Sequence, residues 1–361
     1  MNKLWKKTQQ SEGGQALEQV VPGALTLDKP TVVFFSGLFT TGKGINLVKG
    51  AAGHIEEMLG GAGNNISDHA DIRVWQYKSK RSNLKNIFNY NCFPSRAFSR
   101  NATIFVGDFL LPLVAENGTY NVKKKSFQGQ KKDFKDVEKA FNNLTFMAYS
   151  YGSVFSQEVY NGAKKMMKQV GFSKNQTRLL LSRIHLISMG AVSRPMKEKN
   201  RFTSITLVAT NDRISNHKNK IWWSVKEFFA RAARKLTIRR LTKRNAYITA
   251  PVQKDLFTPH EDKEGQVVMR NIRKLFPAWW PRHSYHELQH YTTDRDFDNE
   301  FSKIARFALL NAMQRDKPLT LEQMIAPANP IVGEGRYSPD EKAVYETRIS
   351  AAMQPLKNAK T

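Results

Sequence analysis

The sequence has a single cysteine, Cys92, among its 361 residues. One cysteine cannot form a disulfide within the chain or a cysteine-based zinc site, and its isolation agrees with a reducing compartment. Long hydrophobic runs are also missing. The most apolar stretch, residues 103–115, is too short to cross a bilayer and is interrupted by Asp108 and Pro112. The sequence therefore predicts a protein without a membrane-spanning helix.

Acidic residues are scarce. The chain has 31 of them against 57 lysines and arginines, which gives a formal net charge of +26. Such a charge attracts an anionic partner, which can be nucleic acid, an acidic membrane leaflet or an acidic protein. Residues 1–14 contain three lysines but no apolar segment of the kind that a secretory signal needs. We therefore expect a cytoplasmic protein, with peripheral association at a membrane surface as one use of its charge.

Six apolar runs rich in β-branched residues have the length and spacing of buried strands. They are residues 31–36, 72–77, 144–150, 184–189, 204–210 and 246–250. Segments with apolar residues three and four apart, such as 155–170, lie between most of them. This alternation predicts an α/β fold with a mostly parallel central sheet and helices on both faces. In such sheets, ligands bind at the carboxyl ends of the strands.

The chain divides by composition into three parts. Residues 1–28 form a polar leader, residues 29–316 form the α/β domain, and residues 317–361 form a proline-containing C-terminal extension. A basic aromatic insertion lies at about 216–245 within the domain. The segment 123–139 is rich in lysine and is expected to be a surface excursion before a helix that leads into the strand at 144.

The strongest chemical motif is Ala148-Tyr149-Ser150-Tyr151-Gly152, at the end of a predicted buried strand. A helical pattern follows directly. A sharp strand-to-helix turn needs small residues beside a nucleophile, because the backbone is strained there and the helix packs close to the strand. Ala148 and Gly152 are small. Ser150 is therefore the candidate nucleophile, although a serine at an ordinary strand end would match the same five residues.

This motif resembles the nucleophile elbow of the α/β-hydrolase superfamily, which usually reads Gly-x-Ser-x-Gly. Ala148 replaces the first glycine and keeps that position small. The resemblance extends over about residues 30–314 and depends on the elbow, the Asn211-Asp212 loop and a histidine-rich loop. It implies a superfamily rather than a particular family.

In this superfamily the acid and then the histidine follow the serine along the chain. Asp212, directly after the predicted strand 204–210, is the candidate acid, with a turn-capping role as its alternative. His286 is the candidate base, because it follows the last predicted strand and precedes a helical segment. His283 and His290 lie in the same cluster and remain alternatives.

The resemblance also implies two backbone donors for an oxyanion: the amide of Tyr151 and the amide of Leu38, after the first predicted strand. Ser150 would attack an ester or related carbonyl, His286 would take its proton, and Asp212 would hold the imidazole. No cofactor is needed. The expected substrate is a small-molecule or lipid ester.

Two other motifs indicate different chemistry. His286-Glu287-Leu288-Gln289-His290 matches His-Glu-x-x-His, in which two histidines a helical turn apart bind zinc. However, Pro281 closely precedes it, where zinc helices usually have apolar or small residues.

The run from Gly37 to Gly44 matches a phosphate-binding loop except at its end, where Gly44 replaces the magnesium-binding serine or threonine. Its partner strand would have to include Phe105-Val106-Gly107-Asp108, but the leucines that follow favour an apolar helix there.

The basic aromatic segment, residues 218–244, has apolar residues at helical spacing and cations elsewhere on the helix. A helix of this kind can lie in a membrane interface, with its cations against anionic head groups. Alternatively, its apolar side packs on the sheet and its cations are solvated. If the triad is degenerate, this segment would supply the function by binding an anionic membrane or nucleic acid. The absence of a known nucleic-acid motif favours the membrane.

Overall fold

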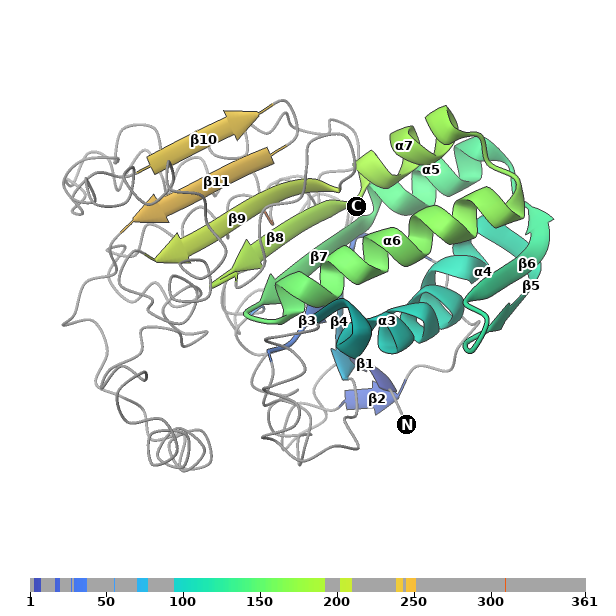
Figure 1. Cartoon of the computed structure of the whole chain (residues 1–361), viewed down its shortest axis with the longest axis horizontal. Coiled ribbons are helices and arrows are strands. Elements are labelled where there is room, and N and C mark those ends of the chain that lie inside the picture. The colour runs from blue at the N-terminus through green and yellow to red at the C-terminus, as the bar shows by residue number, and fades with distance from the viewer. Residues whose placement is uncertain are drawn as a thin grey trace, which may run out of the picture.

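The structure is a computed structural model that describes residues 3–7, 17–19, 27, 29–37, 55, 70–76, 94–191, 202–209, 238–242, 245–250 and 309. Within these ranges, nine strands form one sheet in the order β10-β11-β9-β8-β7-β3-β4-β1-β2 (Figure 1). Their bounds are β1 Lys3–Lys7, β2 Leu17–Gln19, β3 Thr31–Phe35, β4 Asp71–Gln76, β7 Leu144–Tyr149, β8 His185–Met189, β9 Thr203–Ala209, β10 Ile238–Thr242 and β11 Asn245–Ala250.

The centre of this sheet is parallel. Parallel pairings join β4 to β3, β3 to β7, β7 to β8, β8 to β9, and β9 to β11. These strands are the six apolar runs that the sequence predicts, each within one residue at its ends. The α/β class with a mostly parallel sheet is therefore confirmed.

The described helices between β4 and β8 pack on one face of the sheet, and the helices that the sequence predicts on the other face fall outside the described residues. They are α3 Pro94–Phe105, a π-helix Val106–Leu110, α4 Leu111–Val114, α5 Phe134–Asn142, α6 Gly152–Val170 and α7 Lys174–Arg183. Figure 1 shows α6 running alongside the central strands, between α3 and α7. Within the described ranges, no helix combines the length and hydrophobicity needed to cross a bilayer.

Aromatic side chains form the core between the sheet and these helices. The ring of Phe35 on β3 lies 5.1 Å from that of Phe105, 4.9 Å from Phe146 and 5.0 Å from Phe155, measured between centroids. The strand residues that alternate with them, such as Phe34 and Met147, are also buried. Both faces of the central strands are therefore inaccessible to solvent, which explains why their sequences are almost entirely apolar.

The apolar stretch, residues 103–115, contains the π-helix, and a hairpin of two strands follows it and extends into the lysine-rich segment. The hairpin consists of β5 Ala115–Asn121 and β6 Ser126–Lys131. The Tyr120 hydroxyl donates a hydrogen bond of 2.5 Å to the Asp108 carboxylate on the π-helix. A Cβ at Gly107 would lie 2.4 Å from the Tyr120 ring, so this contact requires glycine there. The helix that the leucines of this apolar stretch favour is confirmed. Asp108 lies on the π-helix and not on the strand that a nucleotide site would need.

Three strands in the outer parts of the sheet differ from the sequence expectations. Lys3–Lys7 and Leu17–Gln19, within the predicted polar leader, pair as β1 and β2 at one edge of the sheet. Ile238–Thr242, within the segment with helical spacing, pairs as strand β10 at the other edge. Of these, β2 and β10 are the edge strands and form backbone hydrogen bonds on one side only, whereas β1 pairs with both β2 and β4. Strands in the outer part of a sheet need no fully apolar run and give a weak sequence signal. The rest of residues 218–244 lies outside the described residues.

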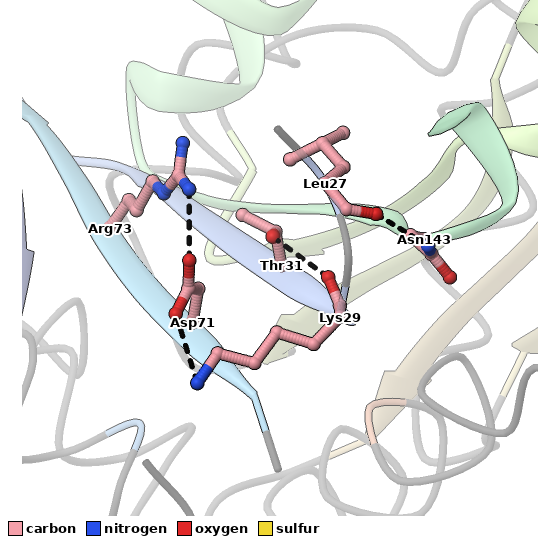
Figure 2. A network of polar contacts seen from close by, with 6 residues as sticks. All are labelled: Leu27, Lys29, Thr31, Asp71, Arg73 and Asn143. Atoms are coloured by element: carbon pink, nitrogen blue, oxygen red, sulfur yellow. Dashed lines mark hydrogen bonds and ion pairs between the residues drawn. The ribbon is translucent and has the colours of Figure 1, made fainter. Parts of the chain in front are cut away.

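A polar network holds together the amino ends of β3 and β4, at the edge opposite the candidate site (Figure 2). The Asp71 carboxylate lies between two cations, 2.8 Å from Arg73 Nη2 and 3.4 Å from Lys29 Nζ. The Asn143 amide donates to the Leu27 carbonyl at 2.7 Å, and the Thr31 hydroxyl donates to the Lys29 carbonyl at 3.1 Å. These contacts attach the segment before β3 to β4 and to the start of β7.

His185, at the start of β8, makes stability depend on pH. Burial lowers the pKa of His185 to about 4, and within the described residues Nδ1 has no hydrogen-bond partner. As pH falls from about 6.5 to about 4, the unfolded chain binds a proton at His185 that the folded chain does not, so stability falls by up to about 3 kcal/mol. We expect the free energy of unfolding of His185→Leu, measured with urea, to fall less than that of the wild type between pH 6.5 and pH 4. If the free energies of unfolding of the two proteins fall equally over this range, the role of His185 is contradicted.

Candidate active site

Ser150 lies at the turn between β7 and α6, at the carboxyl end of a central strand. Its φ of 54° is in the left-handed region, which costs a residue other than glycine about 1–3 kcal/mol. Asn117 and Lys125 are the other described non-glycine residues with positive φ, and both lie in the β5–β6 hairpin. A strained serine between a buried strand and a helix has the backbone geometry of a nucleophile elbow.

Gly152 allows α6 to begin very close to β3. A Cβ on this residue would lie 2.2 Å from the carbonyl oxygen of Phe35 and 3.2 Å from that of Ser36. Real Cβ atoms do not approach a backbone oxygen so closely. The small residue that the motif predicts at this position is therefore required by the packing of helix against strand.

Gly37, two residues after β3, lies directly beside the serine. A Cβ on Gly37 would be 3.3 Å from Ser150 Cβ and 3.3 Å from the Tyr149 ring. The chain passes from β3 to β4 on one side of β3, whereas β7 pairs with its other side. The carboxyl ends of β3 and β7 therefore form the topological switch point of the sheet, where α/β proteins bind ligands.

Backbone contacts hold Ser150 in its strained conformation. Its amide donates to the Met189 carbonyl at 3.0 Å, and its carbonyl accepts from the amide and the hydroxyl of Ser153, at 3.1 and 2.6 Å. Gly190, with φ 53°, donates to the Leu207 carbonyl at 2.9 Å. These hydrogen bonds join the carboxyl end of β7 to that of β8, and the carboxyl end of β8 to β9. They extend from the candidate nucleophile to the strand that precedes the candidate acid.

Tyr151 is the N-cap of α6 and carries one of the two predicted oxyanion donors. Its carbonyl accepts hydrogen bonds from the Val154 and Phe155 amides, both at 3.0 Å. The amino terminus of a 19-residue helix therefore lies next to Ser150, and its partial positive charge favours negative charge there. Leu38, which carries the second predicted donor, follows Gly37 directly but lies outside the described residues.

Asp212 also lies outside the described residues, but the end of β9 is known. Ala209, the last residue of β9, is three residues before Asp212. Since β8 separates β7 from β9, the two strands are about 10 Å apart, and three residues can span up to about 11 Å. The parallel arrangement places the carboxyl ends of both strands at one edge, so an acid after β9 can approach the Ser150 turn from that side.

The histidine cluster, with His283, His286 and His290, lies outside the described residues, as does the whole zinc motif. The described part of the chain contains no group of three or more His, Cys, Asp or Glu side chains that could hold a metal.

Of the phosphate-binding-loop match, the structure describes Gly37 alone. The helical conformation at Val106–Leu110 removes the partner strand that a nucleotide site would need there.

Ser153 and Gly190 are residues that sequence reasoning did not identify. A signal for Ser153 exists, since a serine in the first turn of a helix often bonds back to a carbonyl three residues earlier. Gly190 could not be identified in this way, because its role depends on the pairing of β8 with β9.

No protein-family model matches the chain, and no curated protein matches it.

Proposed function

We propose that this chain is a serine hydrolase of the α/β-hydrolase type that cleaves an ester or related acyl bond through an acyl-enzyme. The observation that carries the proposal is the left-handed Ser150 between β7 and α6, beside Gly37 at the switch point of the sheet. Strain of this kind persists where function requires it and the surrounding structure holds it in place. The contacts of Ser150 with Met189 and Ser153 do so here.

In the proposed mechanism, Ser150 Oγ attacks the substrate carbonyl while His286 takes the hydroxyl proton. Asp212 accepts a hydrogen bond from the other ring nitrogen of His286 and orients it. The amides of Tyr151 and Leu38 donate to the oxyanion of the tetrahedral intermediate. The protonated histidine then gives its proton to the leaving alcohol, and water releases the acyl group from Ser150. The basic aromatic segment, residues 218–244, favours an amphiphilic or lipid ester presented at an anionic surface.

A fluorophosphonate probe tests the proposal, because it reacts covalently with an activated serine. We expect the wild type to be labelled and Ser150→Ala to be unlabelled. Ser156→Ala is the matched control: Ser156 is also buried, lies in α6, which follows Ser150, and donates to the Ser153 carbonyl at 2.8 Å. Equal labelling of wild type and Ser150→Ala, or none of the wild type, would refute the proposal.

Ser150→Gly separates a lost nucleophile from a damaged fold. Glycine adopts positive φ without steric cost, so this variant should be unlabelled yet about 1 kcal/mol more stable than Ser150→Ala. Urea unfolding measures the difference. If Ser150→Gly is no more stable than Ser150→Ala, the serine is not strained and the main support for the proposal is lost.

A further inference from the structure

Two segments of the described chain, residues 117–132 and 159–191, contain no acidic residue. Together they carry nine exposed cations, which we call the basic face: Lys123, Lys124, Lys125, Lys131, Lys164, Lys165, Lys168, Lys174 and Arg178. The first segment contains most of the β5–β6 hairpin, and the second contains the last part of α6 and all of α7. The basic face is thus built from three elements of regular structure.

These segments pack against each other. The Phe127 amide on β6 donates to Gln169 Oε1 on α6 at 3.0 Å. Lys131 Nζ lies 4.7 Å from the centroid of the Phe172 ring, between α6 and α7, and 3.5 Å from Gln176 Oε1 on α7. Figure 1 shows β6 beside the C-terminal end of α6, with α7 next to it. The elements that carry the basic face therefore adjoin one another, and Lys125 at the hairpin turn donates to Ser99 Oγ on α3.

The neighbouring helix α5 has a different charge pattern. Its exposed lysines, Lys135 and Lys139, alternate with Asp136 and Glu138. Glu138 also pairs with Arg183 at 2.5 Å. Neither segment of the basic face contains a carboxylate that would offset its own charge in this way. Because like charges repel, binding of an anion to such a cluster is favourable.

The side chains around these cations favour phosphate groups over a lipid bilayer. Leu179 is the one large apolar side chain that is exposed within the described residues, so little there can insert among acyl chains. Exposed amides such as Gln128, Gln130 and Asn175 lie between the cations. Lysines and amides together are typical contacts of a nucleic-acid backbone. We propose that the basic face binds nucleic acid through its phosphates, without reading the base sequence.

This surface is separate from the candidate active site. Helix α6 begins beside Ser150 and its 19 residues extend for about 28 Å, with Lys164, Lys165 and Lys168 in its second half. None of the cations of the basic face therefore lies at the Ser150 turn. Consequently the nucleic-acid interaction and the serine hydrolase activity can be tested independently.

The experiment measures fluorescence anisotropy of a labelled DNA duplex of about 20 base pairs with the full chain, between about 50 and 200 mM NaCl. The test variant is Lys165→Gln with Lys168→Gln on α6, and the control is Lys135→Gln with Lys139→Gln on α5. Both pairs are exposed lysines on helices, so the charge change is equal.

We expect the wild type and the control to bind two unrelated duplexes equally. Losing two phosphate contacts should reduce the slope of log affinity against log salt by about 2, so that the test variant loses about tenfold less affinity across this range. Three results would overturn the proposal: no duplex binding by the wild type at low salt, equal slopes in test and control variants, or binding to phosphatidylserine vesicles but not to the duplex. Fluorophosphonate labelling of Ser150 should be the same in all these proteins.

Discussion

The Gly152→Ala variant is expected to lose about 3 kcal/mol of stability and to lose fluorophosphonate labelling with it. The added methyl group would lie 2.2 Å from the Phe35 carbonyl oxygen, which belongs to a central strand of the sheet. That oxygen cannot move without disturbing the pairing of β3, so α6 must shift instead. Such overpacking costs about 1–3 kcal/mol, occasionally more, and a contact with backbone lies at the upper end. A shift of α6 also moves Ser150.

Gly162→Ala in the same helix provides the comparison. A Cβ there would be 3.2 Å from a methyl group of Val106, which is a side chain and can adjust. Alanine also gains about 1 kcal/mol of helix propensity over glycine. This variant should remain within about 1 kcal/mol of the wild type and stay labelled. Equal midpoints of urea unfolding for the two alanine variants would show that α6 does not approach β3 as described.

The second large effect concerns the proposed triad. Ser150→Ala and His286→Ala should each lower kcat for a chromogenic ester by about 10⁴ to 10⁶, and the double variant should be no slower than the worse single variant. Residues that act as one unit lose their whole contribution when one of them is removed. Asp212→Asn should lower kcat by about 10⁴ with little change in KM, because it misorients the imidazole rather than weakening binding.

His283→Ala and His290→Ala serve as controls for the histidine, since they lie in the same cluster. If His286→Ala stays active and one of these variants loses kcat by about 10⁴ to 10⁶ instead, the histidine replaced in that variant is the base. Additive losses for Ser150→Ala and His286→Ala would contradict a shared mechanism. Circular dichroism of each variant distinguishes lost chemistry from lost fold.

The central sheet could be predicted from the sequence because its strands are buried on both faces. Runs such as residues 144–150 are mostly apolar, and six of them separated by helical patterns favour a parallel sheet covered on both faces. The strands β1, β2 and β10 could not be predicted, because they contain charged residues, such as Lys6, Glu18 and Arg239, and so form no apolar run. The polarity of residues 123–139 and the helix before β7 could be predicted, but the β5–β6 hairpin could not.

At the candidate site, the sequence could predict what is local. The small residue at Gly152 and the strand before Ser150 are features of one continuous segment, and both have their structural reason in the close approach of α6 to β3. The contacts with Met189 and the position of Gly37 arise from strand order, which no short motif encodes. The roles of Asp212 and His286 depend on residues outside the described ranges and stay predictions.

The most direct test of the central claim is to identify the residue that reacts with a fluorophosphonate. The full-length protein would be treated with the probe and digested, and the modified peptide sequenced by mass spectrometry. The account predicts one adduct per chain, on Ser150, in the peptide that joins β7 to α6. An adduct on any other residue, with Ser150 unmodified, would contradict it.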